Sequence, residues 1–133
     1  MKTMAITVKK LGRLCMANNE ETFRPHYFYV LWCKDHSLYA GYTTDLERRE
    51  KQHNDGTAAK YTRPRTRRPL QMIYAETYRT QTEAMRAEYA FKQLTRAQKE
   101  SYLQENEVVF PLKKSTECIK KDKVTDIEDT TEL

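Results

Sequence analysis

The sequence lacks any apolar run long enough for a membrane-spanning helix, which needs about 18 consecutive apolar residues. It also lacks an internal repeat, a C-x-x-C pair and any histidine at a zinc-finger spacing, because Cys15, Cys33 and Cys118 lie far apart. Lys9 and Lys10 interrupt the N-terminal segment before an apolar signal-peptide core could form. We therefore expect a cytoplasmic protein with free thiols and no membrane contact.

The chain has 133 residues, which fits one domain with a single modest core. Residues 1–24 have weak apolar patterning, so we expect a poorly ordered extension, and Met4 and Met16 leave the natural start open. Residues 25–104 carry the strand and helix patterns of the domain. Residues 105–133 have scattered apolar side chains among many charges and are expected to form a charged C-terminal tail.

The net charge of +5 and the sequence pI of about 9.1 suggest an anionic partner. Acidic residues collect near the C-terminus. Residues 60–68, in contrast, include five basic residues and no acidic one. The folded part of the chain is therefore expected to be more basic than the average of the sequence.

Aromatic and branched residues at 27–33 and 38–43 predict two strands of a hairpin, with a polar turn between them. A capping box at Thr44–Glu47 predicts a helix over 45–54, which ends at Asp55-Gly56. Residues 57–69 are expected to form a loop and residues 70–76 a third strand. Two further capping boxes predict helices over 81–93 and 96–104. The expected fold is α/β (α+β), in the order ββαβαα, with a three-stranded antiparallel sheet flanked by helices.

The first helix places Leu46, Arg49, Glu50 and His53 on one face, because they follow the spacing i, i+3, i+4 and i+7. Taken alone, Arg49 and His53 are more simply explained as the wet margin of an amphipathic helix. The preceding hairpin adds Tyr29 and Tyr39 on neighbouring strands, although strand tyrosines usually serve packing. It also adds Gly41, which would leave the backbone open to a phosphate.

Glu88 lies within the apolar stripe of the second helix, between Ala84 and Phe91. A carboxylate in such a stripe needs a partner, because burying it unpaired costs several kcal/mol. The partner could be an arginine, such as Arg86 or one of the loop cations. A divalent cation is the alternative.

Residues Tyr27-Phe28-Tyr29, Tyr39-Ala40-Gly41, Arg49, His53 and Glu88 resemble, in order and spacing, the pattern of the GIY-YIG nucleases. The resemblance covers roughly residues 26–103 and looks closest to small single-domain bacterial members of uncharacterised function. Tyr27 stands where the first motif has glycine, and Ala40 where the second has isoleucine.

The resemblance implies that Tyr29 and Tyr39 are the motif tyrosines, that Arg49 binds phosphate and that His53 assists it. Glu88 would hold a single Mg²⁺ or Mn²⁺, and Tyr29 would accept the proton of the attacking water. Since an ordinary phenol has a pKa near ~10, Tyr29 would need Arg49 or the metal to lower its pKa.

The basic loop offers contacts to a nucleic-acid backbone that do not read sequence, or it is simply a solubilising loop. Its candidate contact residues are Lys60, Tyr61, Arg63, Arg65, Arg67 and Arg68. We predict a monomeric metal-dependent endonuclease of low sequence specificity acting on nucleic acid, with DNA as the expected substrate. A partner protein could supply targeting. The alternatives are a non-catalytic nucleic-acid-binding module of the same fold, and an adaptor whose acidic tail recruits a protein partner.

Overall fold

The computed structural model describes residues 24–124 and contains one four-stranded sheet with the strand order β2-β1-β3-β4. The strands are β1 (His26–Trp32), β2 (Leu38–Thr43), β3 (Gln71–Tyr78) and β4 (Ile119–Asp122). The helices are α2 (Leu46–Asp55), α3 (Gln81–Lys92) and α4 (Arg96–Glu105), with a short 3₁₀ turn, η1, at Arg65–Arg67. The predicted order ββαβαα is thus confirmed as far as Glu105.

Strand β1 lies at the centre and pairs antiparallel with both β2 and β3. Its hairpin register with β2 sets Tyr29 opposite Gly41 and Leu31 opposite Tyr39. Because successive side chains of a strand point to opposite faces, Tyr29 and Tyr39 come to lie on the same face of the sheet.

The sheet has one strand more than the three predicted, because β4 pairs parallel with β3. Strand β4 lies inside the segment 105–133, for which a charged tail was expected, so the fold extends well beyond Glu105. Its sequence, Ile-Lys-Lys-Asp, has one apolar residue and no strand signature. Backbone pairing with β3 and the packing of Ile119 against the core hold it in place. The expectations for residues 1–24 and for the end of the tail fall mainly outside the described residues.

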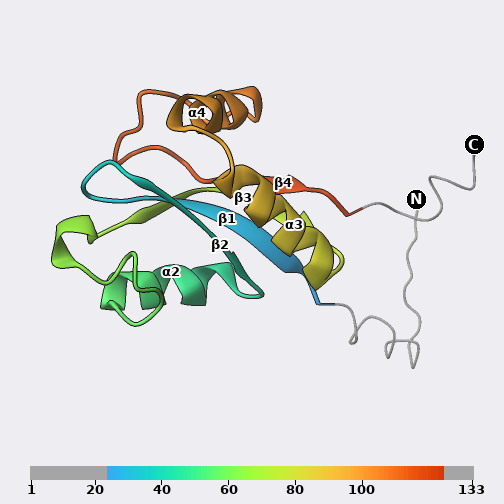
Figure 1. The fold of residues 1–133 in the computed structure, drawn as a ribbon, viewed down its shortest axis with the longest axis horizontal. Coiled ribbons are helices and arrows are strands. Elements are labelled where there is room, and N and C mark those ends of the chain that lie inside the picture. Colours follow the sequence, from blue (N-terminus) through green and yellow to red (C-terminus); the bar gives the residue numbers. More distant parts are fainter. Residues whose placement is uncertain (1–23, 125–133) are drawn as a thin grey trace, which may run out of the picture.

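The two faces of the sheet carry different cores, and Figure 1 shows α2 on one side of the sheet and α4 on the other. Phe28 and Val30 pack with Phe91 of α3 and Leu103 of α4. Tyr29, Leu31 and Cys33 form the second core, against which Leu46 of α2 and Cys118 pack. Alternation along β1 therefore separates the α3/α4 side of the sheet from the α2 side.

The predicted capping boxes at Thr80/Glu83 and Thr95/Gln98 are both present. The one predicted at Thr44 is wrong, since Asp45 is the N-cap of α2 and accepts from the backbone N–H of Arg48. An aspartate caps as well as a threonine, so sequence alone left two adjacent candidates. Among the described residues, no helix is long and apolar enough to cross a membrane.

Candidate active site on the α2 face of the sheet

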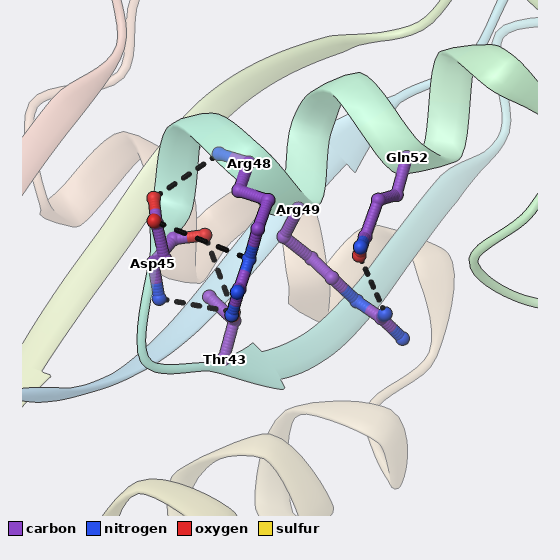
Figure 2. Close-up of polar contacts among 5 residues, drawn as sticks. All are labelled: Thr43, Asp45, Arg48, Arg49 and Gln52. Carbon is purple, nitrogen blue, oxygen red and sulfur yellow. Dashed lines mark hydrogen bonds and ion pairs between the residues drawn. The ribbon is translucent and has the colours of Figure 1, made fainter.

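The start of α2 is fixed by a small polar network directly after β2 (Figure 2). Thr43 Oγ1 accepts from the backbone N–H of Asp45 at 3.1 Å, and Asp45 Oδ1 accepts from the N–H of Arg48 at 3.1 Å. One residue further on, the Arg49 side chain runs beside the helix, where its Nη1 donates to Gln52 Oε1 at 3.1 Å. The cap thus sets the rotation of α2 and with it the direction of Arg49.

Two polar side chains of α2 bind the helix to the beginning of β3. Glu50 Oε2 accepts from the backbone N–H of Met72 at 2.8 Å. Asn54 accepts from the N–H of Leu70 at 2.7 Å and donates to the Leu70 carbonyl at 3.1 Å. The predicted face of Leu46, Arg49, Glu50 and His53 is therefore the face turned toward the sheet.

A buried hydrogen-bond chain joins β1, α2 and the basic loop. The hydroxyl of Tyr29 lies 2.7 Å from Nε2 of His53, and Nδ1 of His53 lies 2.7 Å from the hydroxyl of Thr62. Thr62 in turn donates to the carbonyl of Ala59 at 3.3 Å. Since that bond uses the threonine proton, His53 carries its own proton on Nδ1, and its Nε2 accepts from Tyr29.

Arg49 completes this chain from the helix, with its Nε donating to the Tyr29 hydroxyl oxygen at 3.4 Å. Burial raises the pKa of Tyr29 to about 12, while the hydrogen bond and the charge of Arg49 pull it down less strongly. Arg49 lowers the pKa of Tyr29, as a base role for this phenol would require, but removal from water outweighs one guanidinium among the described residues.

The pKa of His53 is lowered to about 4, first by burial and then by the charge of Arg49. Its imidazole is therefore neutral near pH 7 and presents Nε2 as an acceptor to Tyr29. A neutral imidazole beside a protonated phenol offers an acceptor for the phenolic proton.

Gly41 is buried, and the ring of Tyr29 fills the space beside it. The close approach of a phosphate at Gly41 stays a prediction. A Cβ at this position would lie 2.3 Å from the hydroxyl oxygen and 2.5 Å from Cζ of Tyr29, its cross-strand partner. The missing side chain leaves room for the Tyr29 ring to cross β2 and reach His53.

Tyr39 and Tyr61 form a stack at the edge of this cluster, with ring centroids 5.5 Å apart. The guanidinium of Arg67 covers the Tyr61 ring at 4.0 Å, and its Nε also binds Asp35 at 3.1 Å. Tyr61 and Arg67 were predicted to contact nucleic acid, but here they are engaged with protein groups. Tyr39 also meets the edge of His53, at a centroid distance of 5.3 Å, so the stack leads into the buried chain.

The remaining loop cations divide into two groups. Lys60, Arg63 and Arg65 are exposed, and among residues 24–124 no side-chain partner is assigned to them. Arg68 is half-buried and donates from Nη1 to the carbonyl of Asn54, close to the Cα of Gly56, so it holds the end of α2. The loop thus presents three solvent-facing cations, fewer than the sequence suggested.

Glu88 of α3 lies near the cluster, where its charge acts to raise the pKa of Tyr29. It pairs with Lys92, one helical turn away, at 2.9 Å, and its side chain is 16 % exposed. The sequence left Arg86 and the loop cations open as partners of Glu88, but the partner is Lys92. The described residues contain no cluster of three metal-ligating side chains. One carboxylate still fits Mg²⁺ or Mn²⁺, because such ions commonly take one or two protein carboxylates together with water and substrate phosphate oxygens.

Three participants were missed by sequence reasoning. Thr62 fixes the tautomer of His53, and Gln52 orients Arg49. Lys92 forms an ion pair with Glu88, and its Nζ lies 5.6 Å from the Tyr39 ring centroid. Gln52 and Lys92 follow Arg49 and Glu88 at i+3 and i+4, which is a readable helical signal. Thr62 lies in the stretch 59–63 that resembles the family, but its role was not predicted, because the loop conformation alone brings it to His53.

Comparison with known proteins agrees with the pattern of residues. The family model described as the GIY-YIG catalytic domain matches residues 25–101. A UPF0213 protein of Bacillus velezensis is 60% identical over 80 residues, covering 60% of this chain and 79% of that protein. A UPF0213 protein of Enterococcus faecalis is 59% identical over 83 residues, covering 62% and 94%. A solution NMR structure of an E. faecalis protein is 58% identical, covers 62% of this chain and 85% of that one, and has a TM-score of 0.45.

Proposed function

Since the chain belongs to the GIY-YIG family, a nuclease superfamily, we propose that it hydrolyses phosphodiester bonds in nucleic acid in a metal-dependent reaction. DNA is the expected substrate. The observation that carries this proposal is the buried chain Arg49–Tyr29–His53–Thr62, with Glu88 nearby. Arg49 supplies a cation for the phosphate, and the Tyr29–His53 pair supplies a group that can take up a proton. Glu88 supplies a carboxylate for a metal.

Arg49 is held for phosphate binding by its two protein contacts. Nε is used by Tyr29 and Nη1 by Gln52, while Nη2 has no assigned partner among residues 24–124. Nη2 can therefore donate to a phosphoryl oxygen, where negative charge builds as the water attacks.

Tyr29 and His53 together can accept the proton of the attacking water. Because Tyr29 is protonated at neutral pH, it takes up a proton on its oxygen only as its own proton passes to Nε2 of His53. The phenol then remains neutral and His53 becomes an imidazolium. This cation lies next to Tyr29 and returns its proton to water after the bond is cut.

Glu88 would hold the metal, and to do so it must exchange its contact with Lys92. A bound divalent ion would neutralise the phosphate charge and stabilise the departing oxygen. The displaced Lys92 ammonium would remain beside Tyr39, where it can approach a second phosphate group.

Lys60, Arg63 and Arg65 supply contacts to the sugar-phosphate backbone, because they are exposed and without protein partners among the described residues. Phosphate contacts give affinity without sequence readout. We therefore propose low sequence specificity, in a protein that acts as a monomer or is directed to its targets by a protein partner.

The deciding experiment compares the wild type with Glu88→Gln on labelled duplex, branched and single-stranded DNA and on RNA, with and without Mg²⁺ or Mn²⁺, while binding is followed in parallel. We expect cutting that needs metal and disappears in Glu88→Gln, with binding retained. Lys99→Gln, a charge change on α4, serves as the control and should cut normally. Equal cutting by wild type and Glu88→Gln would contradict the proposal.

A non-catalytic nucleic-acid-binding module is the second candidate, favoured by two observations. Tyr29 is fully buried, and Glu88 is already paired with Lys92. Metal-independent binding without cutting under any of these conditions would favour this function.

A further inference from the structure

Glu76 of β3 is fully buried on the α3/α4 face of the sheet, the face opposite the Tyr29–His53 cluster. Its carboxylate accepts from three phenols: Tyr74 at 2.6 Å, Tyr78 at 2.5 Å, and Tyr102 of α4. No basic side chain among the described residues forms an ion pair with it. The proposed hydrolysis makes no use of this group.

The carboxylate is the acceptor in all three of these hydrogen bonds, which is the role of an ionised carboxylate. All three phenols donate to it, and burial together with the negative charge of Glu76 raises the pKa of Tyr74, Tyr78 and Tyr102 above the ordinary value. A buried anion is costly unless its acceptor sites are filled and a countercharge is near. Three hydroxyls fill three of about four lone-pair sites, which leaves one on Oε1 and provides no countercharge.

A hollow of about 310 Å³ lies over this group, between the sheet and helices α3 and α4. Its walls include the rings of Phe28, Tyr78, Phe91 and Tyr102, and Ala87 and Ala90 of α3 keep it open because their side chains are short. Aromatic faces attract cations, and the two tyrosine oxygens have lone pairs available beside the carboxylate.

We propose that this hollow is a binding site for an alkylammonium group, with Glu76 and its tyrosines as the anionic floor and the aromatic rings as the walls. A primary ammonium has three N–H donors, matched here by the free site on Oε1 and by the oxygens of Tyr78 and Tyr102. The methylene chain would lie against Phe91 and Ala90. The group can belong to a free amine or to a lysine side chain, since both offer the same chemistry to the hollow.

The test is titration of the full-length protein with n-butylammonium chloride, n-butanol and the capped peptide acetyl-Gly-Lys-Gly-amide, followed by amide chemical shifts in NMR spectra. We expect saturable shifts around residues 76–78 and 87–91 with the ammonium probes, and at least tenfold weaker binding of butanol. Tighter binding of the amine than of the peptide would assign the site to a free amine, and the reverse order to a lysine-bearing segment.

Two variants locate the site. Glu76→Gln removes the charge and should weaken binding at least tenfold. Because it could also disturb folding, Ala90→Leu fills the hollow from an exposed position of α3 without touching Glu76, and should abolish binding while the protein stays folded. Glu88→Gln should bind the amine normally, which separates this proposal from the nuclease site. No saturation with either ammonium probe, equal binding of butanol, or unchanged binding by Ala90→Leu would overturn it.

Discussion

The hydroxyl of Tyr29 lies 2.7 Å from Nε2 of His53, although 24 residues separate the two in the chain. This contact joins the central strand to the first helix, and burial of the pair keeps the proton on the phenol and the imidazole neutral near pH 7. The first prediction concerns this pair.

Tyr29→Phe should abolish cleavage, because the ring still packs but no proton can pass to His53. Loss of the donor leaves Nε2 of His53 unsatisfied, so we expect a decrease of about 1–3 kcal/mol in the free energy of unfolding. Single-turnover cleavage and urea unfolding measure the two effects. Tyr42→Phe is a matched control, since the Tyr42 hydroxyl also binds a histidine, His26, at 2.6 Å. Cleavage by Tyr29→Phe at the rate of this control would exclude the proposed proton transfer.

The stability of the protein should fall as the pH is lowered from about 6.5 toward 4. The pKa of His53 is 6.5 when the chain is unfolded and about 4 in the folded protein, so the unfolded chain binds the extra proton in this range. Above pH 6.5 the group is neutral in both states and contributes no pH dependence. The loss should reach about 3 kcal/mol by pH 4, on the scale of 1.36 kcal/mol per pKa unit.

Urea unfolding of the wild type and His53→Gln between pH 4 and 7 checks this prediction. The variant has no group that titrates at position 53, so its stability should change less over the range, by about the amount attributed to His53. Identical slopes for the two proteins would contradict the lowered pKa.

Gly41→Ala should destabilise the protein by about 1–3 kcal/mol, the usual cost of overpacking a core, and should stop cleavage. The new Cβ would lie 2.3 Å from the Tyr29 hydroxyl oxygen and push the ring away from His53. A double-mutant cycle with Tyr29→Leu isolates the effect, because leucine ends before the colliding atoms. We expect the Gly41→Ala cost to drop below about 1 kcal/mol in that background. An unchanged cost would mean that the collision is not its cause.

Replacing both Arg63 and Arg65 by glutamine should weaken DNA binding equally on all sequences. Each lost phosphate contact reduces the slope of log K against log salt by about 0.9 for duplex DNA, so the slope should fall by up to about 1.8. Thermal stability should hardly change, because these side chains have no partner among the described residues. Arg67→Gln is the contrasting variant and should lower the Tm, since Arg67 binds Asp35 and covers Tyr61. If Arg67→Gln weakened DNA binding and the double variant lowered the Tm, the roles of these arginines would be the reverse of those proposed.

Lys92→Gln should increase the affinity of the protein for Mn²⁺, because Lys92 competes with the metal for Glu88. A partly exposed ion pair is worth about 0.2–1 kcal/mol, so the gain should be at most about fivefold. Mn²⁺ binding followed by electron paramagnetic resonance measures it, with Lys99→Gln as the charge-matched control. Weaker Mn²⁺ binding by Lys92→Gln would show that Lys92 helps to build the site.

Local sequence patterns were sufficient for most elements of the fold. The hairpin, the third strand and the helices starting after Thr80 and Thr95 follow from strand propensity and capping chemistry, which act over a few residues. Strand β4 could not be recognised, because its stability comes from pairing with β3, more than 40 residues earlier in the chain, and not from its own residues. The cap of α2 is Asp45, one residue after the predicted Thr44. The sequence could not separate the two, because adjacent capping residues are close in energy.

By itself, the sequence determined which residue types are available to the site, that the helical period places Arg49 and His53 on one face, and that Tyr29 and Tyr39 lie on neighbouring strands. The tertiary structure alone decided how they are used. Gly41 accommodates Tyr29, Thr62 fixes the proton on His53, and Arg67 and Arg68 are bound to protein groups. Burial also decided the pKa values of Tyr29 and His53, because the cost of removing charge from water depends on neighbours that are distant in the chain.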